Sequence, residues 1–64
     1  MKAAQVFKVL IEHKVEFECW PAGRAGLVTF RIKTKHLKQE LLSDLNGATV
    51  MFDQDGAMIL SEGQ

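Results

Sequence analysis

The sequence contains no tyrosine, one proline, one cysteine and one tryptophan in 64 residues. A single cysteine, Cys19, cannot form an internal disulfide, so no disulfide framework supports the fold, and we expect a reducing, cytoplasmic location. No apolar run approaches the ~18 residues that a membrane-spanning helix needs. Disordered chains are typically rich in proline and poor in hydrophobic residues. This chain has one proline and a hydrophobic content of 47%, so its composition is that of a folded protein.

The chain also has no net excess of positive or negative charge, since eight basic residues balance eight acidic ones. The length allows one small domain, which we expect to span residues 1–60, followed by a frayed tail over residues 61–64. A domain of this size buries a small core and is marginally stable as a monomer. Self-association is therefore a natural way to stabilise it.

Hydrophobic periodicity predicts a helix followed by a hairpin in the first half of the chain. Apolar residues recur at helical spacing over residues 2–14. Apolar and polar residues then alternate over residues 15–20 and again over residues 27–33, which predicts two strands joined by a glycine-containing loop. This alternation gives the hairpin one apolar and one polar face.

The second half predicts another helix and another pair of strands. We expect a helix over residues 35–45, with Thr34 as its N-cap. Short strands over residues 48–52 and 57–60 flank a turn at residues 53–56. The predicted fold is α+β, in the order α-β-β-α-β-β, with the two helices packed on one face of an antiparallel sheet.

Two registers are open for the first hairpin. In one of them, Glu16 faces Arg31. In the other, which is shifted by two residues, Glu18 faces Arg31 and Glu16 faces Lys33. Both registers place opposite charges on neighbouring strands, so the sequence leaves the choice open.

The second face of the predicted sheet has no helix to cover it. Apolar side chains gathered on such a face would mark an interface, and we expect a homodimer through this face or through an edge strand. The residues expected to face outward and form the dimer face are Trp20, Leu27, Met51, Met58 and Ile59.

A basic stretch over residues 31–38 holds four of the eight basic residues and no acid. Lysine and arginine side chains in such a group can contact phosphates with salt-dependent affinity. Against this reading, the net charge is zero and Glu16 and Glu18 would lie close to the strand cations. The candidate contact residues for a partner protein or a nucleic acid are Arg24, Arg31, Lys33, Lys35 and Lys38.

The sequence offers few groups for catalysis or metal binding. The soft metal ligands of the chain are Cys19, His13 and His36, and their spacing does not match a zinc site. Cys19 is also the candidate nucleophile, and the two histidines are the candidate bases. Cys19 is expected on the buried face of the hairpin, where a thiol behaves as a small hydrophobe. Residues 53–56 do not continue as a calcium loop and are explained by a turn. We therefore predict no catalytic, cofactor-binding or metal-binding residues, and no enzymatic activity.

These features predict a small, non-catalytic intracellular module that acts by stoichiometric protein binding as a homodimer. Short chains of this kind are typical of bacterial or phage accessory proteins. The alternative is a nucleic-acid-binding regulator that uses the basic stretch over residues 31–38. An affinity that falls steeply with salt would favour the alternative.

Overall fold

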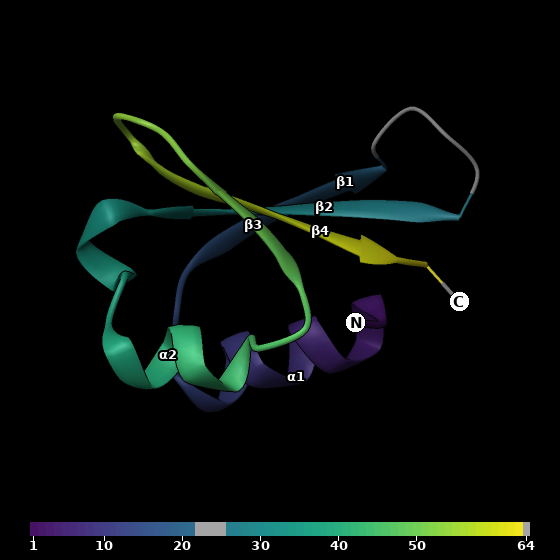
Figure 1. The fold of residues 1–64 in the computed structure, drawn as a ribbon, viewed down its shortest axis with the longest axis horizontal. Helices are drawn as coiled ribbons and strands as arrows, with labels where there is room; N and C mark the ends of the chain where they lie inside the picture. The colour runs from purple at the N-terminus through teal and green to yellow at the C-terminus, as the bar shows by residue number, and fades with distance from the viewer. Residues whose placement is uncertain (22–25, 64) are drawn as a thin grey trace.

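The computed structural model describes residues 1–21 and 26–63. In this part of the chain, two α-helices lie on one face of a four-stranded antiparallel sheet with strand order β1-β2-β4-β3 (Figure 1). The predicted α+β fold and its element order are therefore confirmed. The elements are α1 (Ala3–Glu12), β1 (Phe17–Pro21), β2 (Leu27–Lys33), the 3-10 helix η1 (Thr34–His36), α2 (Gln39–Asp44), β3 (Thr49–Phe52) and β4 (Gly56–Glu62).

Helix α1 forms where the sequence predicts it, with slightly shorter bounds. The backbone N–H of Lys2 donates to Gln5 Oε1 at 3.1 Å, which satisfies one donor at the start of the helix. Lys14 has a φ of 56°, the left-handed conformation that commonly ends a helix. The chain then turns back, and the N–H of Val15 donates to the carbonyl of Leu10 at 3.0 Å.

The second helix is shorter than predicted, and Thr34 does not cap it. The N–H of Thr34 donates to the carbonyl of Asp55 at 3.2 Å, which ties this residue to the β3–β4 turn. The chain makes the 3-10 turn η1 there, is extended at Leu37 and Lys38, and enters α2 only at Gln39. The expected helix over residues 35–45 is therefore wrong in its first turn.

The sheet adopts the second of the two predicted registers, in which Glu18 lies opposite Arg31. The register that pairs Glu16 with Arg31 is wrong. Strand β2 has the predicted bounds, whereas β4 extends through Ser61 and Glu62. Ser61 is buried, and its hydroxyl donates to the carbonyl of Val28 at 3.0 Å. Residues 61 and 62 therefore belong to β4 and not to the frayed tail expected over residues 61–64.

The two ends of the described chain meet at the end of β4. Lys2 forms a backbone bridge with Glu62 in parallel orientation, and its Nζ lies 3.3 Å from Glu62 Oε2. The N–H of Glu62 also donates to the carbonyl of Met1 at 3.2 Å. The beginning of α1 is thus attached to the last strand.

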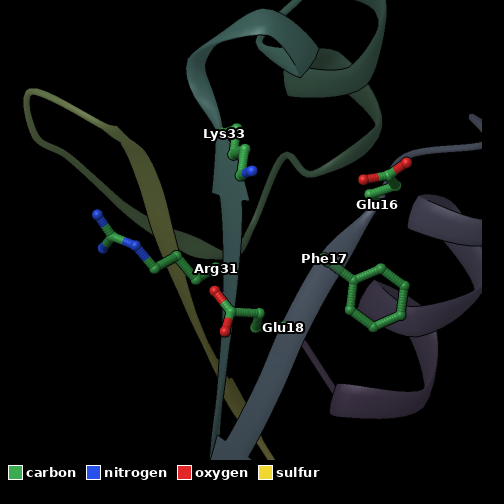
Figure 2. A pocket seen from close by; sticks show the side chains of 5 residues that line it. All are labelled: Glu16, Phe17, Glu18, Arg31 and Lys33. Carbon is green, nitrogen blue, oxygen red and sulfur yellow. The ribbon is translucent and has the colours of Figure 1, made fainter.

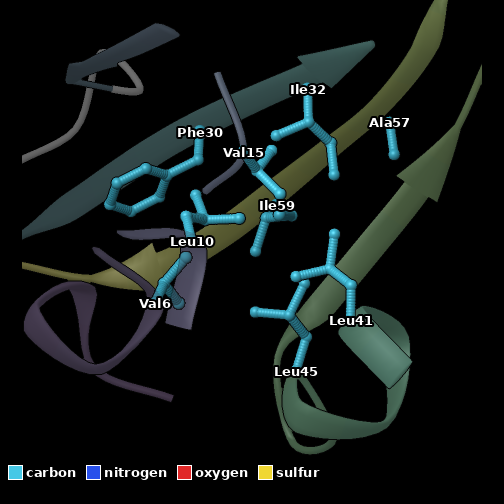
Figure 3. Packing of buried hydrophobic residues seen from close by; sticks show 9 residues of the cluster. All are labelled: Val6, Leu10, Val15, Phe30, Ile32, Leu41, Leu45, Ala57 and Ile59. Carbon is cyan, nitrogen blue, oxygen red and sulfur yellow. The ribbon is translucent and has the colours of Figure 1, made fainter. Parts of the chain in front are cut away.

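The core lies between the helices and the sheet (Figure 3). Ile59 is 0% exposed within it, so the expectation that Ile59 faces outward is wrong. The reason is register, because Ile59 lies opposite Phe30 in β2 and Val50 in β3 on the side that faces the helices. The buried residues of the core are Val6, Leu10, Val15, Phe30, Ile32, Leu41, Leu45, Ala57 and Ile59.

Candidate interaction surface

One face of the sheet is turned away from both helices, and no helix of residues 1–21 or 26–63 lies over it (Figure 1). This face is called the open face. Side chains alternate between the two faces of a strand, so the open face carries the residues that lie between the core positions. Two rows of register partners cross all four strands on this face. The first row is Trp20, Thr29, Leu60 and Thr49, and the second is Glu18, Arg31, Met58 and Met51.

Four of the five residues predicted for a dimer face lie on the open face. Trp20 is 39% exposed and Met51 is 47% exposed, and Leu27 and Met58 are half-buried. The fifth, Ile59, is in the core, and its neighbour Leu60 points to the open face instead. Residues 57–60 are apolar throughout, so no alternation along this segment could have identified Leu60 from the sequence.

Thr29 lies at the centre of the open face and is nevertheless only 1% exposed. Its register partners Trp20 and Leu60 flank it on the two neighbouring strands, and we attribute its burial to their side chains. The apolar centre of the open face is therefore continuous across β1, β2 and β4.

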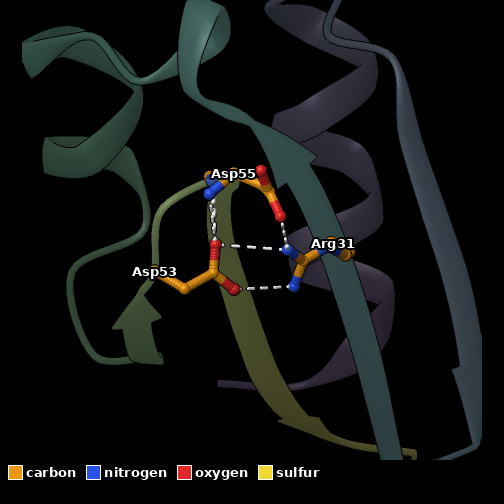
Figure 4. A network of polar contacts seen from close by, with 4 residues as sticks. Arg31, Asp53 and Asp55 are labelled. Atoms are coloured by element: carbon orange, nitrogen blue, oxygen red, sulfur yellow. Dashed lines mark hydrogen bonds and ion pairs between the residues drawn. The ribbon is translucent and has the colours of Figure 1, made fainter.

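The charged end of the open face is organised around Arg31 and the β3–β4 turn (Figure 4). The guanidinium of Arg31 makes two contacts with Asp53, Nη1 to Oδ2 at 2.9 Å and Nη2 to Oδ1 at 3.2 Å. Asp53 Oδ1 also accepts the backbone N–H groups of Asp55 at 2.8 Å and Gly56 at 2.9 Å. One carboxylate thus holds both the turn and the arginine.

This network shifts the ionisation of both partners. The hydrogen bond from Arg31, followed by the backbone hydrogen bond from Asp55, lowers the pKa of the Asp53 carboxyl. The hydrogen bond to Asp53 is the largest effect that raises the pKa of Arg31 above its ordinary value. Each bond favours the charged form of the group that makes it.

The basic stretch does not form a uniform cationic surface. Arg31 is ion-paired, and Lys33, Lys35 and Lys38 are exposed. His36 is half-buried, and its Nε2 is buried without a hydrogen-bond partner among the described residues. Arg24 lies outside the described residues.

Acidic side chains lie beside two lysines of this stretch, Lys33 and Lys35. A hollow of about 320 Å³ is lined by Glu16, Phe17, Glu18, Arg31 and Lys33 (Figure 2). A second hollow of about 560 Å³ includes Glu18 and Asp55 as well as Lys33 and Lys35. A polyanion entering either hollow would meet carboxylates together with the cations.

A second exposed apolar surface, not anticipated from the sequence, lies along α1 beside β1. Phe7 is 50% and Ile11 53% exposed, and the Phe7 ring contacts the Phe17 ring edge to face, with a centroid distance of 5.5 Å. Cys19 is exposed, so the expectation that it is buried is wrong. The apolar stripe of α1 is wider than the part of the helix that the core covers. The width of this stripe is the feature of the sequence that could have indicated an exposed apolar surface on α1.

The candidate metal ligands and nucleophile, His13, His36 and Cys19, lie on different elements. His13 Nε2 lies 2.7 Å from Asp44 Oδ2 and links the end of α1 to the end of α2, while Cys19 is on β1. Within residues 1–21 and 26–63, no group of three or more His, Cys, Asp and Glu side chains is arranged to hold a metal ion.

Comparisons with protein-family models, with curated proteins and with solved structures gave no match. In the described part of the chain, neither helix has the length and apolar character required to cross a membrane.

Proposed function

We propose that this chain is a small, non-catalytic protein-interaction module that acts by stoichiometric binding, in the cytoplasm, as a homodimer. The observation that supports this function is the apolar centre of the open face. Its exposed and half-buried members are Trp20, Leu27, Met51, Met58 and Leu60. Apolar side chains gathered on one face are the usual mark of an interface.

A second copy is the occupant that the open face fits best. The chain exposes 4451 Å², and a standard interface removes about 800 Å² from each partner. Such an interface would take roughly a fifth of this surface, which corresponds to one whole face of the molecule. Burial of that area would also supply the apolar contacts that a core of nine residues lacks.

The charged end of the open face is compatible with this packing. Arg31 already has Asp53 as a bidentate partner in its own chain. Removing a paired charge from water costs less than removing an unpaired one. The second copy therefore does not have to supply a counter-ion for Arg31.

The test is the mass in solution, measured by light scattering at 50 mM and 500 mM salt on protein freed of nucleic acid. The expected result is a dimer at both salt concentrations, because apolar contacts are not screened. Met51→Glu places a charge on the open face and is expected to give a folded monomer. Phe52→Glu is the matched control, since Phe52 is the next residue of β3, is 62% exposed and points to the other side of the sheet.

Two outcomes would contradict the proposal. One is a monomer at both salt concentrations. The other is a monomer that copurifies with nucleic acid and releases it at 500 mM salt, which would assign binding to Lys33, Lys35 and Lys38 and favour a nucleic-acid-binding regulator.

A further inference from the structure

Strand β1 lies at one edge of the sheet, and only β2 pairs with it among the described residues. An edge strand presents backbone N–H and C=O groups that another extended chain can pair with. The other edge strand, β3, has four residues, whereas β1 has five. The surroundings of β1 determine which chain could be added there.

The helix-facing side of this edge is apolar and exposed. Val6 and Leu10 point into the core, and Phe7 and Ile11 follow each of them by one residue, about 100° further around α1. Phe7 meets Phe17 of β1, so this flank of the helix lies on the β1 side. A strand added to β1 would extend the sheet over the exposed halves of Phe7 and Ile11.

The other side of this edge is acidic. Glu18 points to the open face, and Glu16 precedes β1 by one residue. Neither forms a salt bridge with any residue that the structure describes. Arg31, the register partner of Glu18, is engaged by Asp53 instead.

These charges discriminate between two kinds of added strand. Pairing β1 with β1 of a second copy would gather Glu16 and Glu18 of both chains on one narrow strip, and neighbouring like charges destabilise a sheet. A strand that carries basic residues on that side and apolar residues on the other would satisfy both sides of the edge. Opposite charges on adjacent strands stabilise the pair.

We propose that the β1 edge binds an extended segment of another protein, in which basic residues face Glu16 and Glu18 and alternate with apolar residues that cover Phe17 and the Phe7–Ile11 flank. This is recognition by strand addition, in which backbone hydrogen bonds supply affinity and alternate side chains supply specificity. The inference rests on the protein-binding function proposed above. The β1 edge shares Glu18 with the open face but does not include Leu27, Met51, Met58 or Leu60.

The probe is a labelled peptide of sequence Leu-Val-Thr-Phe-Arg-Ile-Lys, which copies residues 27–33 and has the required alternation. Its control is Leu-Val-Thr-Phe-Glu-Ile-Glu. Binding is measured by fluorescence anisotropy at 50 mM salt, and the site is mapped from amide chemical shifts. We expect the basic peptide to bind at least tenfold more tightly than the acidic one, with shifts confined to β1 and the α1 flank.

Reversal of the charge on the protein makes the test specific. Glu18→Lys changes an exposed side chain and is expected to invert the order of the two peptides, so that the acidic peptide binds more tightly. Met51→Glu is expected to abolish the dimer and leave peptide binding unchanged. Failure of dimerisation and failure of strand addition are thus separate results.

Three results would overturn the inference. One is equal binding of both peptides to the unmodified protein. Another is shifts that extend into β4, which would mean that the peptide displaces β2. The third is a dimer in which the β1 amides that point away from β2 are already protected from hydrogen exchange without peptide, which would assign this edge to a second copy.

Discussion

Arg31 and Glu18 lie opposite each other on adjacent strands, yet Arg31 pairs with Asp53 from the β3–β4 turn. Asp53 offers both carboxylate oxygens to the guanidinium, a geometry that favours arginine–carboxylate pairing. The consequence is a difference between the two sides of the open face. Arg31 and Asp53 neutralise each other at the β3–β4 end, and Glu18 at the β1 edge has no salt-bridge partner among the described residues.

The Arg31–Asp53 pair predicts a specific dependence of stability on pH. The pKa of Asp53 is lower in the folded chain than in the unfolded chain, where it is about 3.9. The contribution of Asp53 to stability is therefore fully present above that value and is lost as the pH falls through the lower folded pKa. Urea unfolding between pH 7 and pH 2 is expected to show a shallower loss of stability for Asp53→Asn than for the unmodified protein.

A carboxyl carbon titration by NMR gives an independent measurement of the same effect. The Asp53 midpoint should lie below about 3.9. Arg31→Gln removes the largest cause of the shift and should move the midpoint upward, whereas Lys33→Gln serves as the control. A midpoint unchanged by Arg31→Gln would contradict the assignment of the shift to this pair.

Gly56 is predicted to tolerate no side chain. It begins β4 with a φ of +153°, and a Cβ there would lie 1.9 Å from the carbonyl oxygen of Ile32. Gly56→Ala should reduce the free energy of unfolding by about 3 kcal/mol or more, from backbone strain together with displacement of β2. Urea denaturation followed by circular dichroism measures the loss.

Gly47 provides the matched control for that substitution. Its φ is +99°, and a Cβ there would meet nothing within 4 Å. Gly47→Ala should therefore cost only the left-handed conformation, about 1 kcal/mol. Equal losses at the two positions would show that the contact with Ile32 does not matter.

Adjacent residues of β4 face opposite sides of the sheet, so we predict unequal losses of stability when each is replaced by alanine. Ile59 is 0% exposed, and Ile59→Ala should cost about 3 kcal/mol because it leaves a cavity in the core. Met58 is on the open face, and Met58→Ala should cost less than about 1 kcal/mol. Both are measured by urea denaturation in the Met51→Glu background, so that association does not contribute, and similar losses would contradict the facing.

The sequence predicted those elements whose pattern is unambiguous. Strand β2 alternates strictly between apolar and polar residues from Val28 to Lys33, and its bounds were predicted correctly. The first turn of the second helix was predicted wrongly. The leucines of residues 37–45 fit helical spacing, whereas the hydrogen bond from Thr34 to Asp55 is a tertiary contact. Local pattern cannot reveal a bond between residues 21 positions apart.

The parts of the candidate surface that sequence could not assign depend on register. Both hairpin registers paired opposite charges, so charge alone did not choose between them. The outward direction of Leu60 rather than Ile59 is set by pairing with β2, since Phe30 lies opposite Ile59. Phe7 and Ile11 belong to the same apolar stripe as Val6 and Leu10, and only the position of α1 beside β1 shows which pair is exposed.

Lys2 and Glu62 lie side by side at the end of β4, so the described chain enters and leaves the domain at one place (Figure 1). A unit with adjacent ends can be inserted into a surface loop of a host protein without stretching the junctions. The same adjacency allows the ends to be joined by a short linker and the chain to be opened elsewhere, which would give a circular permutant with an unchanged sheet.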